Sequence, residues 1–360
     1  EMALAAKAWG QDIRVWAPHH EAFRSSKPFP FPVKSLPVRG SQSWLDRLQL
    51  RRTFRDKIRP GIQSGDLLHI AEVGPLITGL VFPELFFQHS GSTLITIHGS
   101  EIIRFPGSWF YRKRFEHFLD RADAIHVLSK YNQRKLLDLF PHLHAKVIQV
   151  PGGPRTSQKS SQLPLSKQAH TCVLLTLGRI HPRKGQAELI AYLSDLPEAL
   201  KSQVELWVVG PITKHRYFRQ CARLAKTSGV PVRFLHGCPD SSLPNLFQKA
   251  EVFILPSMPH PSSVEGLGLA NLEAAQQGLP VLAHRVGGIT ETLEEGKTGF
   301  LISPGDSSAF CASLETLIRD PDLRRSMGES AKTFSRKFSW EQAARRLYLE
   351  PFSQSSRISP

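Results

Sequence analysis

A loop with three basic side chains follows a buried strand in the segment LLTLGRIHPRKGQAELI. The strand ends at Gly178, and Arg179, Arg183 and Lys184 come within six residues, before a helix that starts at Gln186. In open α/β sheets the carboxyl ends of the strands face the ligand crevice, and helix N-termini attract anions. The loop therefore predicts a diphosphate site. If this loop were the only signal, the simpler interpretation would be that its basic residues are solvated and have no function.

A second loop joins a strand to a helix in FILPSMPHPSSVEGLGLANLEAAQQG. The strand ends near Ser257, the helix is expected over residues 267–277, and Gly278 ends it. Gly266 and Gly268 carry no Cβ, so backbone amides at the helix start can approach a phosphate or a sugar closely. This turn is the second predicted ligand contact.

Two carboxylates flank that turn, Glu265 before it and Glu273 inside the helix. Eight residues of helix turn through about 800°, so the two would not share one face of a continuous helix. If Glu265 lies in the loop, both can point into one pocket and accept hydrogen bonds from sugar hydroxyls. The alternatives are a charge that compensates the helix dipole for Glu265 and an exposed helix position for Glu273.

Short apolar runs alternate with helical periodicity along the chain, which is typical of parallel sheets with strands buried on both faces. Strands are predicted at residues 12–18, 66–70, 93–99, 123–129 and 146–150, and again at 171–178, 204–210, 232–237, 250–257, 279–285 and 299–303. The Pro-, Ser- and Lys-rich segment 151–170 is predicted to be a linker. Two doubly wound domains with a ligand cleft between them follow from this pattern.

The composition is that of a globular chain long enough for two domains, with 360 residues, 41% hydrophobic and 21% charged. The longest apolar stretch, residues 73–87, is broken by Pro75, Pro83 and Glu84, so we expect no membrane-spanning segment. Four scattered cysteines form neither a zinc motif nor a disulfide framework, which favours a reducing cytoplasm.

The net charge of +15 is concentrated in the first half. Residues 1–165 contain 23 Lys and Arg against 13 Asp and Glu, and residues 166–360 contain 23 against 18. Such a field attracts anionic lipid, nucleic acid or phosphorylated ligands. The helix WFYRKRFEHFLDR, from Trp109 to Arg121, mixes aromatic and basic residues as surface-binding helices do. For this helix alone we prefer the simpler interpretation, in which Trp109, Phe110 and Phe118 belong to an ordinary core.

The chain opens inside an alanine-rich helix, EMALAAKAWG, with Gly10 as its C-terminal stop, before the first predicted strand. Rossmann-type domains begin instead with a strand whose glycine-rich turn leads into the first helix. We therefore expect that the first strand and the glycine-rich turn of the N-terminal domain are missing from this chain.

Several ordered motifs resemble the family 4 glycosyltransferases. They are GRIHPRKG, LWVVG, LHG, AEVFILPS, EGLGLANLE, GLPVLA, VGGITETLEEGKTGFLISPGD and FSWEQAARRL, and the match is strongest from Thr171 to Asp306. The resemblance implies a retaining enzyme of the GT-B fold, an α/β architecture of two Rossmann-like domains facing across a cleft. It implies an acceptor-binding domain at 1–165, a nucleotide-sugar domain at 166–335, and at 336–360 a helix that crosses back to the first domain, with a tail.

The resemblance also implies roles for single residues. Glu265 would contact hydroxyls of the donor sugar, Glu273 would hold the nucleotide ribose, and Arg179 and Lys184 would bind the diphosphate. His98, in ITIHGSEI, would lie near the reacting sugar and the acceptor. His98, Arg179, Lys184 and Glu265 are thus the implied catalytic residues. Other implied donor-binding residues are Gly178, Gly210, Gly237, Gly266, Leu267, Gly268 and Leu269, and the other implied acceptor-binding residues are Gly99, Ser100 and Glu101.

Two departures from the family pattern stand out. PGGP, at residues 151–154, replaces the common Pro-Asn-Gly, so that Gly152 takes the place of an asparagine. Leu267 takes the place of the usual phenylalanine in the glutamate motif, a mild apolar change.

The mechanism follows from where charge develops. Cleavage of the bond between the anomeric carbon and the diphosphate leaves negative charge on the phosphates, which the basic loop and the helix amides would stabilise. We expect neither a cofactor nor a metal, because the chain shows no metal-chelating aspartate pair. Retention by same-face attack and retention through a covalent intermediate both stay open.

The expected partners are a nucleotide-sugar donor and a glycan or lipid-linked acceptor, in polysaccharide, lipopolysaccharide or glycolipid assembly. The basic N-terminal domain predicts a further, peripheral contact with an anionic membrane. The protein is expected to be cytoplasmic and to contact the inner face of that membrane. A nucleotide-sugar epimerase of the same fold is an alternative, although such enzymes lack a separate acceptor site. A non-catalytic binder of anions or nucleic acid would explain the charge, but no nucleic-acid motif is present, and we expect no such partner.

Overall fold

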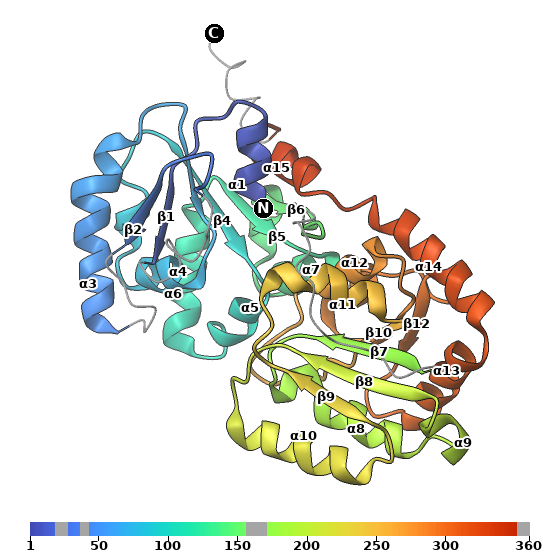
Figure 1. Cartoon of the computed structure of the whole chain (residues 1–360). Coiled ribbons are helices and arrows are strands. Elements are labelled where there is room, and N and C mark those ends of the chain that lie inside the picture. The colour runs from blue at the N-terminus through green and yellow to red at the C-terminus, as the bar shows by residue number, and fades with distance from the viewer. Residues whose placement is uncertain (19–27, 37–42, 156–170, 351–360) are drawn as a thin grey trace. The chain divides into compact units, whose positions relative to one another are not determined.

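The computed structural model describes residues 1–18, 28–36, 43–155 and 171–350 (Figure 1). The chain divides into two compact units, one formed by Glu1–Pro151 with Trp340–Pro360, the other by Gly152–Ser339. The sequence placed these divisions after residues 165 and 335. Most of the predicted linker, residues 156–170, and the tail after residue 350 lie outside the described residues.

Six parallel strands form the sheet of the second unit, in the order β12-β11-β10-β7-β8-β9. Each lies within a range predicted from the sequence, so these six strands are confirmed, with shorter ends. Their bounds are β7 Cys172–Leu177, β8 Val204–Val209, β9 Val232–Leu235, β10 Val252–Leu255, β11 Val281–His284 and β12 Gly299–Ile302.

Side chains along these strands alternate between two core layers. Leu174, Leu206 and Ile254 belong to the layer covered by α8 (Gln186–Ser194), α10 (His215–Thr227) and α13 (Ser307–Arg319). Leu175 and Trp207 belong to the opposite layer, covered by α11 (Leu243–Lys249) and α12 (Leu269–Gln276). Because successive strand residues point to opposite faces, a sheet covered on both faces needs continuous apolar strands. The short α9 (Glu198–Lys201) and the long α14 (Pro321–Ser335) complete this unit.

The first unit contains a four-stranded parallel sheet in the order β3-β4-β5-β6 and a separate two-stranded sheet. The four strands, all confirmed, are β3 Leu67–Ile70, β4 Ser92–Ile97, β5 Ala124–Val127 and β6 Val147–Gln149. The first predicted strand is β1 (Val15–Pro18), which pairs in parallel with β2 (Val33–Leu36). The sequence missed β2, because VKSL carries two polar residues in its four and is too short to show a period.

The helices of the first unit are α1 Met2–Ala8, α3 Trp44–Thr53, α4 Val73–Val81, α5 Ser100–Arg104, α6 Trp109–Asp120, α7 Lys130–Leu139 and α15 Trp340–Tyr348. Gly10, with φ +81°, follows α1 as predicted. Across the described residues, none of the helices combines the length and the apolar character that crossing a bilayer requires.

The simpler interpretation of α6 is wrong for its first turn. Phe115 and Phe118 are buried in the core of the first unit. Trp109 and Phe110, however, are 73% and 52% exposed. Core formation therefore explains only the second half of this helix, and its aromatic N-terminus stays in contact with solvent.

The last described helix, α15, belongs to the first unit and packs beside α1 (Figure 1). Ala343 and Leu347 share a small core with Leu94, Ala124 and Val150. The indole Nε1 of Trp9, just after α1, donates to Glu341 Oε1 at 3.1 Å. The first and last helices of the described residues thus pack together in the first unit.

A run of hydrogen bonds, partly buried at His69 and buried at His126, also ties α15 to the four-stranded sheet. Tyr348 OH lies 2.9 Å from His69 Nδ1, and His69 Nε2 lies 2.7 Å from Thr96 Oγ1. Thr96 Oγ1 lies 2.9 Å from His126 Nδ1, and His126 Nε2 donates to the carbonyl of Val150 at 2.8 Å. With both histidines neutral and protonated on Nε2, every step has one donor and one acceptor. Burial lowers the pKa of His69 to about 3 and that of His126 to about 4, which keeps them neutral at pH 7.

Candidate functional site

The ends of β7 and β8 approach each other where the predicted diphosphate loop begins. Gly210, directly after β8, has φ +138°, and a Cβ there would lie 2.2 Å from the carbonyl oxygen of Gly178. Only glycine fits such an approach. The backbone then runs through Arg179 to a single helical turn, Pro182–Lys184, which carries the other two bases.

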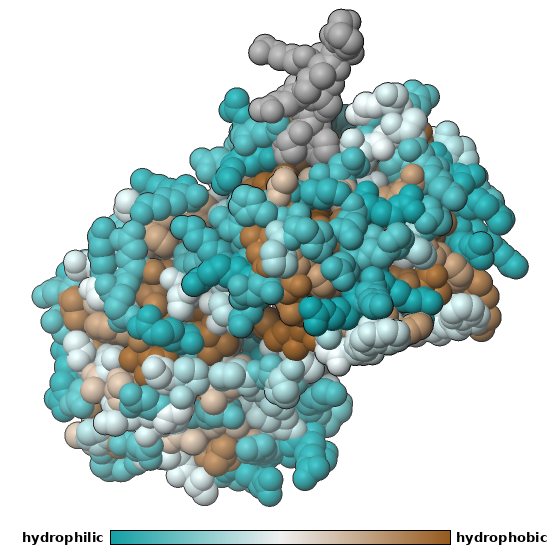
Figure 2. Space-filling view, turned by 180° about the vertical axis from the view of Figure 1, so that it is seen from behind, coloured by the Kyte–Doolittle hydropathy of each residue, from teal (hydrophilic) through white to brown (hydrophobic). Residues whose placement is uncertain are grey.

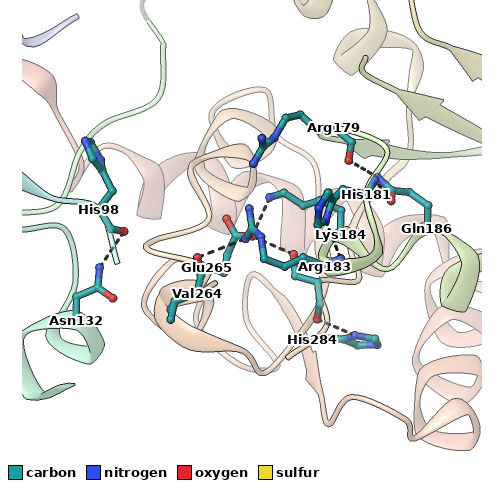
Figure 3. A network of polar contacts seen from close by, with 11 residues as sticks. His98, Asn132, Arg179, His181, Arg183, Lys184, Gln186, Val264, Glu265 and His284 are labelled. Atoms are coloured by element: carbon teal, nitrogen blue, oxygen red, sulfur yellow. Dashed lines mark hydrogen bonds and ion pairs between the residues drawn. The ribbon is translucent and has the colours of Figure 1, made fainter. Parts of the chain in front are cut away.

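Arg183, Lys184 and Glu265 form a charged cluster, named here the Glu265 cluster (Figure 3). Glu265 Oε2 accepts from Arg183 Nη1 at 2.5 Å, from Lys184 Nζ at 2.8 Å and from Ser257 Oγ at 3.2 Å. The exposed fractions of the three charged side chains are only 11%, 14% and 11%. The basic loop and the glutamate turn, about 80 residues apart in sequence, are therefore parts of one site.

Glu265 is ionised in this setting. Burial raises its pKa, but the charges of Lys184 and Arg183 and the hydrogen bonds from Lys184 and Ser257 bring the pKa below its ordinary value. Among the described residues, all three donors reach Oε2 and none reaches Oε1. One carboxylate oxygen is therefore left to accept from a ligand.

Two glycines support the backbone of the Glu265 turn. Gly288 N donates to the carbonyl of Glu265 at 2.9 Å. A Cβ on Gly287 would lie 2.4 Å from that same carbonyl oxygen, and a Cβ on Gly288 would lie 2.2 Å from the carbonyl oxygen of Gly266. Neither glycine can be enlarged without moving the turn.

The helix after the turn is α12, and it begins at Leu269, two residues later than predicted. Gly268 is its N-cap and has a left-handed φ of +78°, which ends the loop there. Glu265 therefore lies in the loop, the condition under which it and Glu273 can serve one ligand. Leu267 is 2% exposed, so its side chain anchors the turn in the core.

Glu273 has a cation partner of its own, Arg155, which the sequence had not singled out. Arg155 Nε lies 2.6 Å from Glu273 Oε1, and Arg155 Nη1 lies 2.9 Å from Asp240 Oδ2. The Glu273 side chain is 12% exposed, and that of Asp240 80%. The two predicted glutamates are therefore held by different basic residues from different segments.

The other predicted donor residues lie nearby in sequence but outside these contacts. Arg179 is exposed, and its carbonyl accepts from Gln186 Nε2 at 3.0 Å (Figure 3). Its guanidinium has no hydrogen bond or ion pair within the part of the chain that the structure describes. Gly237 lies in an exposed turn after β9, and a Cβ added there would have no atom within 4 Å.

A buried histidine lies behind the Glu265 cluster. His284, at the end of β11, has its Nδ1 3.2 Å from the carbonyl oxygen of Ser257, the residue whose hydroxyl contacts Glu265. Burial lowers the pKa of His284, so the ring is neutral and donates through Nδ1–H. The sequence did not single out Arg155, Ser257 or His284. Only the glycine pair 287–288 had a readable signal, as two glycines in the loop that follows a strand.

His98 follows β4 in the first unit and is exposed. Its Nε2 donates to the carbonyl of Ala71 at 2.8 Å, and Asn132 Nδ2 donates to the His98 carbonyl at 3.2 Å (Figure 3). With Nε2 as the donor, Nδ1 carries the lone pair and can accept a hydrogen bond.

The residues after His98 form the start of α5. Gly99 has φ +127°, and its N–H donates to Glu101 Oε2 at 2.9 Å. Glu101 is 2% exposed, so its carboxylate caps this helix from inside the core. Ser100, the first residue of α5, is partly exposed.

The charged groups of the second unit can bind an anion beside a hydroxyl-bearing ligand. The Glu265 cluster offers two cations and one open carboxylate oxygen, and the start of α12 adds backbone amides. In the part of the chain that the structure covers, three or more His, Cys, Asp or Glu side chains nowhere gather in an arrangement that could hold a metal ion.

Comparison with known proteins gives a consistent result. Residues 159–334 match the family model of the glycosyl transferases group 1. The D-inositol 3-phosphate glycosyltransferase of Corynebacterium efficiens is 31% identical over 253 residues, covering 64% of this chain and 57% of the relative. A GDP-mannose-dependent alpha-(1-6)-phosphatidylinositol monomannoside mannosyltransferase of Mycolicibacterium smegmatis is 34% identical over 221 residues, covering 59% and 57%. This chain thus spans little more than half the length of either relative.

The fold is shared more widely. A sucrose-phosphate synthase from Thermosynechococcus elongatus superposes with a TM-score of 0.78 at 20% identity, covering 99% of this chain and 92% of that one. The expected GT-B fold is thereby confirmed.

Proposed function

We propose that this chain, whose residues 159–334 match the family model of the glycosyl transferases group 1, is a retaining glycosyltransferase. It moves a sugar from a nucleotide-diphosphate sugar to the hydroxyl group of an acceptor. The Glu265 cluster is the observation that carries this proposal, because it combines an anion site with an acceptor of hydroxyl hydrogen bonds.

Departure of the nucleotide diphosphate is the step that the basic loop assists. Negative charge grows on the leaving phosphate as the bond to the anomeric carbon breaks. Lys184 and Arg183 are already held in place by Glu265, and Arg179 is free to turn toward the phosphates. Cations placed before the reaction stabilise such charge without the cost of reorganisation.

Glu265 positions the donor sugar in this proposal. Its Oε2 is occupied by three donors, while Oε1 is open to a sugar hydroxyl. A carboxylate fixed at one oxygen presents the other in a defined direction, which is what orientation of a sugar ring requires. Glu273 takes the hydroxyls of the ribose, in competition with Arg155 for Oε1.

Retention and metal independence are parts of the same proposal. The cations of the basic loop supply the charge that a metal ion would otherwise supply at the diphosphate. Same-face attack, in which the departing phosphate takes the proton of the acceptor, needs no protein nucleophile and is the route we favour.

The acceptor is a glycan or a lipid-linked molecule, bound at the residues His98 to Glu101. His98 supports this through its oriented ring, which leaves Nδ1 to face a ligand hydroxyl. We further propose a cytoplasmic enzyme in contact with the inner face of an anionic membrane, acting in polysaccharide, lipopolysaccharide or glycolipid assembly. The charge excess of residues 1–165 and the phosphatidylinositol mannoside named for one relative support it.

Turnover of a panel of nucleotide sugars, with a metal chelator present, tests the proposal. We expect one donor to release its nucleoside diphosphate, and the anomeric configuration of the product, read by proton NMR, to equal that of the donor. Glu265→Gln keeps the size of the side chain but removes its charge, and it should lower kcat by about 100-fold or more, the scale of a lost electrostatic contact in a transition state.

Binding of the nucleoside, which lacks the diphosphate, is the control for this variant. Since Glu265 contacts the basic loop and the sugar but not the nucleoside, Glu265→Gln should leave nucleoside affinity within about threefold, a change of under 1 kcal/mol. Unchanged turnover in Glu265→Gln, or an inverted product, would refute the proposed roles.

A further inference from the structure

The first turns of α6 present aromatic and basic side chains to solvent together. Trp109, Phe110 and Tyr111 are 73%, 52% and 38% exposed, and the next three residues, Arg112, Lys113 and Arg114, are exposed as well. Lys113 Nζ lies 5.0 Å from the centre of the Trp109 ring, and the guanidinium of Arg114 lies 4.2 Å from that of Phe110. The cations and the rings therefore form one mixed surface.

A second such surface lies at the start of α3. Trp44 and Leu45 are 55% and 70% exposed, and Arg51 and Arg52 of the same helix are exposed too. Of the seven strongly exposed large hydrophobic side chains among the described residues, five lie in the first turns of α3 and α6. Burial in the core therefore cannot account for these five.

The end of α4 joins the two helices. Two side chains of α3 contact the ring of Phe82. The centre of the Trp44 ring lies 5.9 Å from the centre of the Phe82 ring, and the guanidinium carbon of Arg51 lies 4.6 Å from it. Two residues earlier, the carbonyl of Leu80 accepts from Arg114 Nη1 of α6 at 3.2 Å. The exposed residues of α3 and α6 thus flank the end of α4, and together they are named here the α3–α6 face. In Figure 2 brown side chains interrupt the teal surface at the edge of the first unit where α3 lies.

The chemistry of this face fits one kind of partner. Aromatic rings interleaved with Lys and Arg are the composition of surfaces that lie in the headgroup region of a membrane, with rings among the lipids and cations at the phosphates. A second copy of this chain would bring the same cations against each other, so the face is poorly suited to self-association. Helix α10 of the second unit is also basic. The described residues of the second unit, however, include no strongly exposed large hydrophobic side chain, so they offer cations without rings for the lipids.

We propose that the α3–α6 face docks the protein on an anionic lipid surface, with Trp44, Leu45, Trp109 and Phe110 inserted among the lipids. This deepens the proposed function by naming the partner surface, and it rests on the membrane part of that proposal. It does not depend on the Glu265 cluster, so docking can succeed or fail independently of sugar transfer.

Sedimentation with vesicles tests the docking. The chain is mixed at low salt with vesicles of phosphatidylcholine alone or with phosphatidylglycerol added, and the bound fraction is measured against lipid concentration. Each Lys or Arg near an anionic surface contributes about 1 kcal/mol, so Arg112→Gln/Lys113→Gln/Arg114→Gln should weaken binding about 100-fold. The matched control is Arg216→Gln/Arg219→Gln/Arg223→Gln on α10, which removes the same charge from the other unit and should change binding much less.

Insertion is measured separately from adsorption. Tryptophan emission should shift to shorter wavelength with anionic vesicles and be quenched by brominated acyl chains, and Trp44→Phe/Trp109→Phe should lose this response while still sedimenting. Trp44→Ala/Phe110→Ala should weaken sedimentation although every charge is kept. Circular dichroism confirms that each variant is folded.

Three results would overturn the inference. The first is an absence of binding to anionic vesicles at low salt. The second is equal loss in the α6 and α10 variants, which would reduce the effect to net charge. The third is a concentration-dependent dimer, seen by analytical ultracentrifugation, that the α3–α6 substitutions abolish. If Glu265→Gln still binds anionic vesicles but no longer transfers sugar, membrane docking is shown to be independent of the catalytic proposal.

Discussion

The two glutamates of the site differ in how they are held. Glu265 is nearly buried and bonded through one oxygen to Arg183 and Lys184, so its orientation is fixed before any ligand arrives. Glu273 is bonded to Arg155, whose side chain is 43% exposed. An ion pair that is partly open to water is worth little and can be exchanged for a ligand. In the proposed function, one part of the donor would therefore meet a rigidly held carboxylate and another part an exchangeable one.

Arg155 should therefore compete with the nucleotide for Glu273. Arg155→Ala removes the competitor and should tighten nucleotide binding by about two- to fivefold, since exposed ion pairs contribute about 0.2–1 kcal/mol. Isothermal titration calorimetry measures the change. Asp240→Asn, which leaves the pair between Arg155 and Glu273 intact, should have a smaller effect. Weaker binding in Arg155→Ala would mean instead that Arg155 contacts the nucleotide or orients Glu273.

Among the elements, the turn before α12 is shaped by glycines from the next loop. The 3-10 turn Gly287–Glu291 lies against the carbonyls of Glu265 and Gly266, and two of its glycines leave no room for a Cβ. The position of the carboxylate therefore depends on residues more than 20 positions away.

Gly288→Ala should disturb both stability and the site. Its Cβ would meet the Gly266 carbonyl oxygen at 2.2 Å, which forces the backbone of the turn to move. Overpacking of this kind costs about 1–3 kcal/mol, and nucleotide affinity should fall with it. The matched control is Gly74→Ala in α4, where no atom lies within 4 Å of the new Cβ. Equal unfolding free energies for both variants in urea would contradict this picture of the turn.

His69 and His126 make the stability of the first unit depend on pH. Folding lowers the pKa of His126 to about 4 and that of His69 to about 3, from about 6.5 in the unfolded chain. The stabilisation is complete above pH 6.5 and is lost as the pH falls toward the folded values, because only the unfolded chain takes up these protons. Each histidine should contribute up to about 1.4 kcal/mol per pH unit in this window.

Urea unfolding at several pH values between about 7.5 and about 5 measures this slope. His126→Asn should reduce this slope by the contribution of one histidine. The difference between the variant and the wild-type chain therefore isolates His126 from the other buried histidines. Tyr348→Phe, in contrast, should lower stability at every pH and leave the slope unchanged. A slope that is the same in His126→Asn and the wild-type chain would show that His126 is not kept neutral by folding.

The sequence predicted the elements better than the contacts between them. Apolar runs identified every strand of the two larger sheets, because strands covered on both faces must be continuously apolar. They missed β2, whose four residues include Lys34 and Ser35. The basic loop and both glutamates could be chosen from spacing and family resemblance. Arg155, Ser257 and His284 could not, since long-range packing alone brings them to the site.

For the molecule as a whole, the two units divide the chemistry proposed here. The second unit contains the Glu265 cluster, Glu273 and Arg179, and it also contains every other residue assigned to the donor. The first unit contains His98 and the α3–α6 face, and both ends of the described chain pack on it through α1 and α15. Donor binding should therefore be a property of the second unit, whatever acceptor the first unit takes.

The most direct test of the central proposal is calorimetric titration of this chain with UDP, GDP, ADP and CMP and their common sugar conjugates, in the presence of a metal chelator. We predict that one diphosphate nucleotide binds and that Glu273→Ala weakens its binding at least tenfold, about 1.4 kcal/mol. Lys184→Ala should lower the affinity for this nucleotide more than it lowers the affinity for the corresponding nucleoside. Absence of binding for every nucleotide to a chain shown to be folded, or equal affinity in Glu273→Ala, would contradict it.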